Sequence, residues 1–324
     1  MKTPSGEKKT LHLATHSGWY RFEREGKKWS PVERALSYWS MTCLAVDPED
    51  PNSVYAGTER SGLFISRDGG ASWKRPDPNV PRLSTCSLLA LSGELLVGTV
   101  PAALFRAASD GWEEMEGLRR CGAGSIFPPN PDLGSRTRYL ASDPKAPARV
   151  YAGIEVGGML LSDDGGFTWK PCNEGLSDPD VHEVVACARN SGLVVAACGE
   201  GVFRSLDRGA HWEKITPPGP RAYGTAVAED GDGEIYLGIA RGRPNTWLRE
   251  ERADSAIFRS KDGGVHWQAV IEGLRGGVMD ICADSEGDGI FAGTSEGELI
   301  AADSAGTKVV ASGLPCINAV AVGG

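Results

Sequence analysis

The sequence feature that most constrains the fold is a motif, S-x-D-x-G-x-x-W, that occurs four times and begins at Ser66, Ser162, Ser205 and Ser260. Its Asp can accept backbone N–H bonds within one turn, its Gly permits a positive φ, and its Trp offers a large apolar surface. We therefore expect each copy to form a structural hairpin turn. The predicted structural residues are Asp68, Trp73, Asp164, Trp169, Asp207, Trp212, Asp262 and Trp267.

A second recurring stretch precedes the motif, as in Leu44-Ala-Val-Asp47-Pro with Val54-Tyr-Ala-Gly57, and again in Leu140-Ala-Ser-Asp143-Pro with Val150-Tyr-Ala-Gly153. Together the two patterns describe a unit of four short strands, with the motif between the third and the fourth. The template predicts units at 41–76, 85–118, 139–176, 181–218, 222–274 and 277–314, with degenerate motifs near Asp110 and Asp303.

The two ends of the chain complete each other. Residues 11–32 contain strands two, three and four of a unit without a strand one, and Ile317–Val322 reads as the missing strand. A linear solenoid is the alternative, but complementary ends favour a ring without unpaired edges. The sequence therefore predicts an all-β chain. It forms a single β-propeller of seven four-stranded blades over 11–324, closed by the C-terminal strand, with 1–10 as a disordered tail.

The repeated motif resembles the Asp-box, or BNR, repeat of sialidases, sortilin-type receptors, xyloglucanases and a photosystem II assembly propeller. The resemblance covers nearly the whole chain. It implies the propeller fold strongly and a function only weakly, because proteins with unrelated activities share the repeat.

Composition excludes several classes of function. A net charge of −9 argues against binding to nucleic acid or to an anionic membrane. The eight cysteines form no Cys-x-x-Cys pair and lie at no metal-binding spacing from a His, so neither a metal nor a cofactor is expected. The polar N-terminus lacks the apolar core of a secretory signal, which favours a cytoplasmic location.

The expected binding face carries the loops between strands two and three and between successive units. Both long insertions, 119–138 and 240–256, belong to this face, and long loops in compact repeats are typically functional. The same loops contain many Arg and no Lys, and guanidinium groups bind carboxylate, sulfate or phosphate through paired hydrogen bonds. The candidate arginines are Arg60, Arg82, Arg136, Arg138, Arg221, Arg241 and Arg243.

Acidic and aromatic residues recur in these loops. Equivalent positions between strands two and three hold Glu59, Glu155, Glu200 and Glu296, with His16 in the first unit. These side chains are candidates either for acid–base chemistry or for pairing with the arginines. Trp39 and Tyr223, just before a strand one, are candidate stacking platforms for a ligand, and packing between units is the other interpretation of Trp39.

Two functions follow from these residues. The first is a binding or scaffold propeller that recognises an anionic small molecule, a glycan or a partner protein through its arginine-rich face. The second is a glycoside hydrolase, sialidase-like or of another Asp-box type, acting on an acidic or complex glycan. The sequence departs from the sialidase pattern, because no Pro follows Tyr20-Arg21-Phe22. It also has length for one propeller, whereas the xyloglucanases that it resembles use two.

Overall fold

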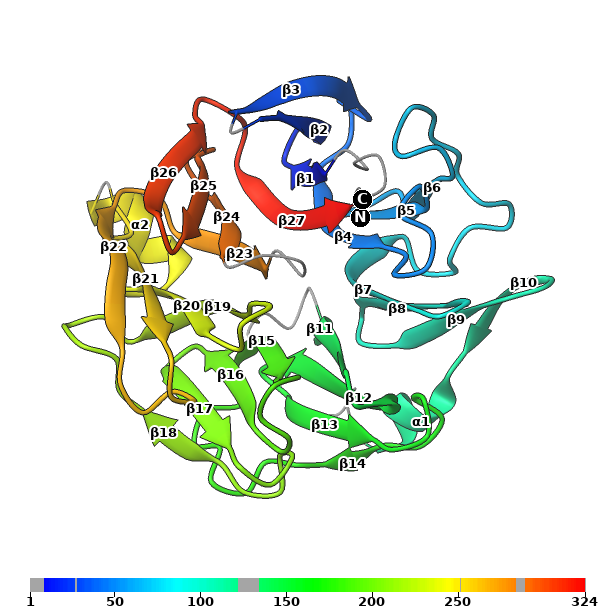
Figure 1. Cartoon of the computed structure of the whole chain (residues 1–324). Helices are drawn as coiled ribbons and strands as arrows, with labels where there is room; N and C mark the ends of the chain where they lie inside the picture. The colour runs from blue at the N-terminus through cyan, green and yellow to red at the C-terminus, as the bar shows by residue number, and fades with distance from the viewer. Residues whose placement is uncertain (1–8, 27, 122–133, 251, 284–288, 324) are drawn as a thin grey trace, which may run out of the picture.

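In the computed structural model of this chain, seven antiparallel sheets surround a central axis as a β-propeller (Figure 1). The structure describes residues 9–26, 28–121, 134–250, 252–283 and 289–323. We call the sheets blades A to G in chain order. The predicted all-β propeller with seven blades and a closed ring is confirmed. Most of the predicted tail lies outside the described residues, and the first strand begins at Thr10.

In every blade the strands lie side by side from the axis to the rim (Figure 1). From the axis outwards, blade A contains β27 (Ile317–Gly323), β1 (Thr10–Thr15), β2 (Gly18–Glu25) and β3 (Lys28–Ala35). Blade B contains β4 (Met41–Val46), β5 (Val54–Thr58) and β6 (Leu63–Ser66). Blade C contains β7 (Ser84–Leu91), β8 (Glu94–Val100), β9 (Leu104–Ala108) and β10 (Gly111–Glu114).

The remaining blades follow the same order. Blade D contains β11 (Arg136–Asp143), β12 (Ala146–Glu155), β13 (Gly158–Ser162) and β14 (Lys170–Pro171). Blade E contains β15 (Val181–Ala186), β16 (Val194–Cys198), β17 (Gly201–Ser205) and β18 (Glu213–Ile215). Blade F contains β19 (Tyr223–Glu229), β20 (Ile235–Ala240), β21 (Ser255–Ser260) and β22 (Gln268–Leu274). Blade G contains β23 (Val278–Ala283), β24 (Ile290–Thr294), β25 (Leu299–Asp303) and β26 (Gly306–Ala311).

The ring closes where the last strand joins the first blade. Strand β27 pairs antiparallel with β1, with Thr10 opposite Gly323 and Leu13 opposite Val320. The Thr10 hydroxyl also donates a 3.0 Å hydrogen bond to the Gly323 carbonyl. Blade A is therefore assembled from both ends of the chain, as the sequence predicts.

The outer edge of blade B is the irregular part of the ring. Its fourth strand is reduced to one bridge between Ile65 and Lys74. Prolines at 76, 78 and 81 follow at once, and proline cannot donate to a ladder. The Asn79 amide takes the place of a strand residue, accepting from the Leu63 N–H at 3.1 Å and donating to its carbonyl at 3.2 Å. The edge strand thus keeps its hydrogen bonds without a full partner.

The S-x-D-x-G-x-x-W turns have the hydrogen bonds that the motif predicts. In the copy of blade D, Asp164 accepts from the Thr168 N–H at 2.8 Å and from the Thr168 hydroxyl at 2.6 Å. The Ser162 hydroxyl donates to Asp164 at 2.8 Å and accepts from the Gly166 N–H at the same distance. Because these partners lie within a few residues of one another, the turn is specified locally.

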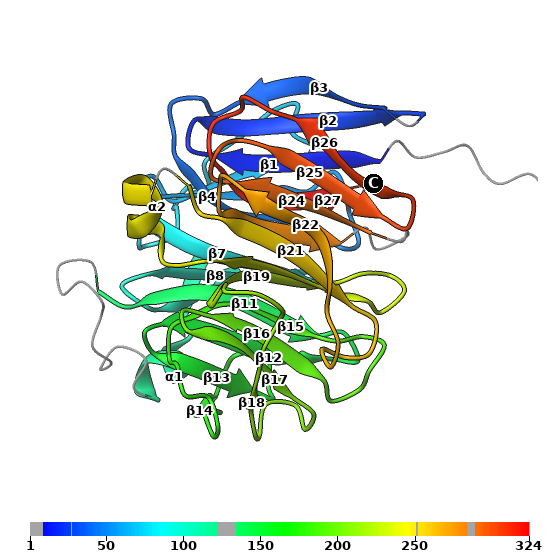
Figure 2. The same ribbon diagram turned by 90° about the vertical axis from the view of Figure 1, so that its left-hand side faces the viewer.

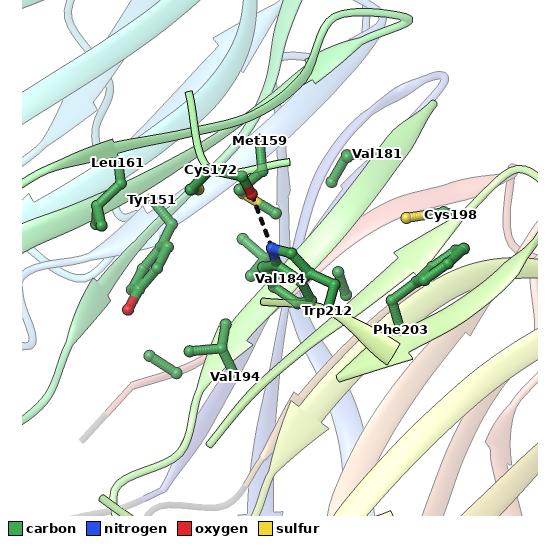
Figure 3. Packing of buried hydrophobic residues seen from close by; sticks show 12 residues of the cluster. Tyr151, Met159, Leu161, Cys172, Val181, Val184, Val194, Cys198, Phe203 and Trp212 are labelled. Carbon is green, nitrogen blue, oxygen red and sulfur yellow. Dashed lines mark hydrogen bonds between the residues drawn. The ribbon is translucent and has the colours of Figure 1, made fainter. Parts of the chain in front are cut away.

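The Trp of the motif packs between blades, as Figure 3 shows for Trp212. This side chain is 5% exposed and lies against Tyr151, Met159 and Cys172 of blade D. Its indole N–H donates a 2.7 Å hydrogen bond to the Cys172 carbonyl. The tryptophan therefore joins two neighbouring blades by both apolar contact and a hydrogen bond.

Two short helices were not predicted from the sequence. Helix α1 (Glu116–Arg120) follows β10, and helix α2 (Pro244–Glu250) lies in the insertion between β20 and β21. Since neighbouring strands are antiparallel, connections between the second and third strands lie at the opposite end of each blade from the S-x-D-x-G-x-x-W turns. Figure 2 shows α2 on one face of the ring, which is the expected binding face.

Every innermost strand carries a β-bulge near its start. In each of the seven, the pairing with the second strand shifts by one residue, which leaves one residue of the inner strand without an opposite partner. We call these residues the bulge ring: Thr42, Cys86, Arg138, His182, Thr225, Met279 and Asn318. A bulge re-aims a side chain relative to the regular alternation of a strand.

Candidate binding site

The candidate site is a cavity of about 910 Å³ on the propeller axis. Its wall is formed by the inner strands of the blades, and all seven bulge-ring residues line it. Three of them tie successive blades together at 2.6–2.7 Å. The Thr42 hydroxyl, a ring nitrogen of His182 and the Asn318 amide each contact a backbone carbonyl of the next blade. The bulge ring is therefore part of the inner seam between blades as well as the cavity wall.

Of the predicted arginines that line this cavity, Arg136 and Arg138 are the less exposed ones. Both line it, and their side chains are 32% and 38% exposed. Each approaches the same oxygen, Glu155 Oε2, at 3.6 and 3.7 Å. At these distances the two contacts are ion pairs but not hydrogen bonds. Within the described part of the chain neither guanidinium donates a side-chain hydrogen bond, so their paired N–H groups remain available to a ligand.

Tyr223 lies beside this arginine pair and is held by His182. The Gly224 carbonyl can only accept, so His182 Nδ1 carries the hydrogen of their 2.6 Å contact. In the neutral ring Nε2 then accepts from the Tyr223 hydroxyl at 3.1 Å. Burial and the Asp180 charge raise the pKa of Tyr223 above its ordinary value. The phenol is therefore a fixed neutral group rather than a nucleophile.

Asp180 completes the cluster and was not singled out as a site residue by sequence. Its Oδ1 lies 3.5 Å from His182 Nε2. Burial alone would raise its pKa, but its contact with His182 and the positive charges of Arg243 and Arg138 lower it overall. The structure thus brings four predicted residues, Arg136, Arg138, Glu155 and Tyr223, together with two that were missed. The only sequence signal for Asp180 and His182 was their place at the start of a strand one.

The other predicted arginines have separate environments. Arg60 lines the cavity, is exposed and lies 3.6 Å from Glu59. Arg82 donates to the Pro101 carbonyl at 3.1 Å. Arg221 is 8% exposed and is tied to Asp254 at 3.2 Å and Glu272 at 2.8 Å. Arg241 and Arg243 are exposed, and Arg243 is close enough to affect Asp180 and Tyr223.

The remaining candidates do not converge on one point. The side chains of Glu59, Glu200, Glu296 and His16 are exposed, and of these only Glu59 and His16 line the cavity. Trp39 packs against Phe64 of blade B, with ring centroids 4.9 Å apart. This environment matches packing between units more closely than it matches an exposed stacking platform for a ligand.

Deeper in the cavity the wall carries polar residues that sequence reasoning missed. Tyr139, Glu183 and Asp280 immediately follow the bulges of blades D, E and G. Burial raises the pKa of Asp280 to about 6, and burial together with the Asp280 charge raises that of Glu183 well above its usual range. The sequence signal that could have identified the two acids is a charged residue inside an otherwise apolar strand. Glu183 in Val181-His-Glu-Val-Val-Ala186 is an example.

A second hollow of about 630 Å³ lies between blades B and C. Its polar groups already bind one another: Arg67 donates to the Tyr55 hydroxyl at 3.0 Å and to Ser53 at 2.8 Å, and Tyr55 reaches Asp47 at 3.4 Å. The arginines of the axial cavity make ion pairs at 3.6–3.7 Å but donate no side-chain hydrogen bond within the described residues, so this cavity is the stronger candidate.

Neither a metal site nor a membrane-spanning helix is found among the described residues. No group of three or more of their His, Cys, Asp and Glu side chains is placed to hold a metal ion. Neither helix is long and apolar enough to cross a bilayer.

Comparisons with known proteins agree on the fold. No family model matches the chain. It is 31% identical over 161 residues to a xyloglucanase of Acetivibrio thermocellus, covering 40% of this chain and 19% of that protein. It is 28% identical over 190 residues to an oligoxyloglucan-reducing end-specific xyloglucanase of Emericella nidulans, covering 51% and 22%. The chain thus spans about a fifth of the length of these curated relatives.

Two solved structures show the same propeller. A GH74 xyloglucanase from Xanthomonas campestris superposes with a TM-score of 0.67 at 17% identity, over 90% of this chain and 49% of that one. YCF48 bound to a D1 peptide superposes with a TM-score of 0.61 at 19% identity, over 92% and 97%. At these identities the likeness concerns the fold.

Proposed function

We propose that this chain is a binding propeller that takes an anionic group at the mouth of its axial cavity. The ligand is a small molecule, glycan or protein that carries a carboxylate, sulfate or phosphate. The observation that supports this function is the pair Arg136 and Arg138, which share one carboxylate oxygen at 3.6 and 3.7 Å. An incoming oxyanion can accept the paired N–H groups that Glu155 does not engage.

The surroundings favour the same ligand. Arg60 lines the cavity, and Arg243 adds a further positive charge near the cluster. Guanidinium groups stay charged at any relevant pH. The single-propeller neighbour YCF48 is described with a bound peptide, which supports recognition rather than catalysis as a use of this scaffold. The proposal keeps the expected cytoplasmic location, which fractionation of the host cell tests.

The test is a double Arg136→Lys, Arg138→Lys variant, which keeps both charges but loses the paired geometry. Ligands for calorimetry are uronates, sialic acid, sulfated sugars and phosphorylated metabolites. We expect binding of the best ligand to weaken by about tenfold or more, because charge-assisted paired bonds are the strong ones.

Arg106→Lys is the matched control, since Arg106 pairs with Glu94 and Glu113 far from the cavity. The proposal fails if no anion binds, if the double variant binds as well as the wild type, or if neutral glycans bind without dependence on salt.

The second candidate is a glycoside hydrolase, sialidase-like or of another glycan-cleaving type. It is favoured by the similarity to xyloglucanases and by two acids, Glu183 and Asp280, in the cavity wall. Against it, Asp280 accepts the Val320 N–H at 2.7 Å and Glu183 accepts that of Val227, so both carboxylates are fixed between blades. Release of reducing sugar from xyloglucan or of sialic acid from sialosides, lost in Asp280→Asn, would favour the hydrolase instead.

A further inference from the structure

The wall of the axial cavity changes in character along the inner strands, which surround it in all seven blades (Figure 1). Because neighbouring strands are antiparallel, every inner strand begins at the binding face and runs away from it. The bulge ring lies near these starts and carries Thr, Arg, His or Asn at five of its seven positions. The number of residues beyond the bulge ring therefore measures depth in the cavity, at about 3.3 Å per residue.

Three residues beyond the bulge ring the wall is apolar. Blades C to G each contribute one side chain that lines the cavity at this depth: Leu89, Ala141, Val185, Ala228 and Cys282. We call these five residues the apolar level. A cysteine thiol behaves as a small hydrophobic group, so none of the five offers a strong hydrogen bond. The apolar level lies about 10 Å beyond the bulge ring along the strands.

Four of these side chains keep part of their surface exposed. Leu89, Ala141, Val185 and Cys282 each pack against a hydrophobic core cluster between blades, yet none is fully buried. An innermost strand has the rest of its own blade behind it and a neighbouring blade on either side. The surface that stays exposed therefore faces the axis. A ligand gains affinity by removing such apolar surface from water.

One partly exposed acid lies between the bulge ring and the apolar level. Asp280 immediately follows the bulge of blade G, and its carboxyl group accepts the Val320 N–H at 2.7 Å. This hydrogen bond holds the carboxyl group against the next blade. Its negative charge would repel a second anionic group at this depth. The negative charge of a ligand is therefore confined to the mouth, beside Arg136 and Arg138.

We propose that the ligand of this cavity is a small amphipathic anion with one carboxylate, sulfate or phosphate head and an unsubstituted apolar tail. The head binds Arg136 and Arg138, and this half rests on the proposed function. The tail lies along the axis against the apolar level. A sugar chain would instead place hydroxyl groups against Leu89 and Val185, which cannot pair with them. A cavity of about 910 Å³ lined by apolar side chains and a few polar groups is typical of small-molecule sites.

The test is calorimetry with straight-chain carboxylates of increasing length: butanoate, hexanoate and octanoate. Burying one methylene group contributes about fourfold in affinity, so octanoate should bind at least about tenfold more tightly than butanoate. The heat-capacity change of binding should become more negative along the series, because apolar burial has that signature.

Two matched anions test the nature of the tail. Gluconate has the six carbons of hexanoate but carries hydroxyl groups along them, and octanedioate adds a second carboxylate to octanoate. Both should lose the affinity that the hydrocarbon tail provides, because the apolar level cannot pair with hydroxyl groups and Asp280 repels the second charge.

Variants assign the effect to residues. Leu89→Asn makes the wall polar at nearly constant side-chain size, and Ala141→Leu fills part of the space for the tail. Each should lower the ratio of octanoate affinity to butanoate affinity by about threefold or more. The matched control is Leu206→Asn, because Leu206 is 62% exposed in the S-x-D-x-G-x-x-W turn of blade E. This control should leave the ratio unchanged, and thermal melts establish that all variants are folded.

The outcomes separate the two proposals. The apolar tail is wrong if octanoate binds no more tightly than butanoate, if gluconate matches hexanoate or octanedioate matches octanoate, or if both wall variants keep the wild-type ratio. In those cases an anion whose binding weakens in the double Arg136→Lys, Arg138→Lys variant still supports the proposed function. If 1-octanol binds as tightly as octanoate, and the double variant binds octanoate as the wild type does, the anion site fails while the apolar level stands.

Discussion

Replacing Trp212 by alanine tests how the blades are held together. The side chain is 5% exposed and contacts blade D through Tyr151, Met159 and Cys172. Removing a buried aromatic of this size costs about 3–5 kcal/mol. The loss of its N–H also leaves the Cys172 carbonyl without the 2.7 Å hydrogen bond from the indole.

The expected change in melting temperature follows from chain length. An unfolding entropy of about 2.1 cal/mol/K per residue makes each kcal/mol worth about 1.5 °C, so Trp212→Ala should lower Tm by about 4–7 °C. Differential scanning calorimetry measures this shift. Trp212→Phe, which keeps an apolar ring but loses the hydrogen bond, should fall between the wild type and the alanine variant.

Trp112→Ala is the matched control. Trp112 lies at a degenerate copy of the turn, is only partly buried and donates to the Pro78 carbonyl at 3.1 Å. We expect a smaller decrease of Tm. Neither variant should alter ligand binding at the axial mouth, because these turns lie at the opposite end of the blades. The reasoning is refuted if Trp212→Ala melts no lower than Trp112→Ala, or loses ligand binding while keeping its stability.

Three further predictions concern closure, the turns and pH. Deleting 317–324 should cause unfolding or oligomerisation, because β1 would be left as an open edge; a monomer with unchanged Tm by light scattering and calorimetry contradicts this. Asp164→Ala should lower Tm without weakening ligand binding, whereas Asp164→Asn, which keeps an acceptor for the Thr168 N–H, should lower it less. Burial raises the pKa of Asp280 to about 6 in the folded chain, above its ordinary value of 3.8. The native state therefore binds the proton more tightly, and this group lowers stability as pH rises from about 4 through 6. Denaturant titrations at pH 5 and pH 7 should show a smaller pH-dependent loss in Asp280→Asn than in the wild type.

Local patterns were sufficient to predict the repeating unit and the ring. The hydrogen bonds of the S-x-D-x-G-x-x-W turn join atoms within four residues, so the motif specifies its own conformation. Ring closure could also be predicted from the sequence, because the two ends of the chain supply complementary strands of one blade. The exception is blade B, where three prolines restrict the fourth strand and the amide of Asn79 replaces part of it.

From the sequence, the candidate site could be located only to one face of the propeller and not to particular residues. Arg136 and Arg221 both lie near the start of an inner strand and looked equivalent. Arg136 reaches the cavity, whereas Arg221 is enclosed by Asp254 and Glu272, which lie 33 and 51 residues further along the chain. No local pattern encodes which acid will meet which arginine, because that depends on how loops of one blade pack.

The sequence by itself determined the repeated blade, its turns and the closure of the ring, because those features depend on periodic apolar residues and on hydrogen bonds between near neighbours. Only the tertiary structure decided which residues meet at the axis. A β-bulge in each inner strand turns one residue per blade toward the cavity, among them Arg138 and His182. It also puts Glu183 and Asp280, 97 residues apart in sequence, on one wall. Side chains from seven blades become neighbours only when the ring closes, since every inner strand then faces the same axis.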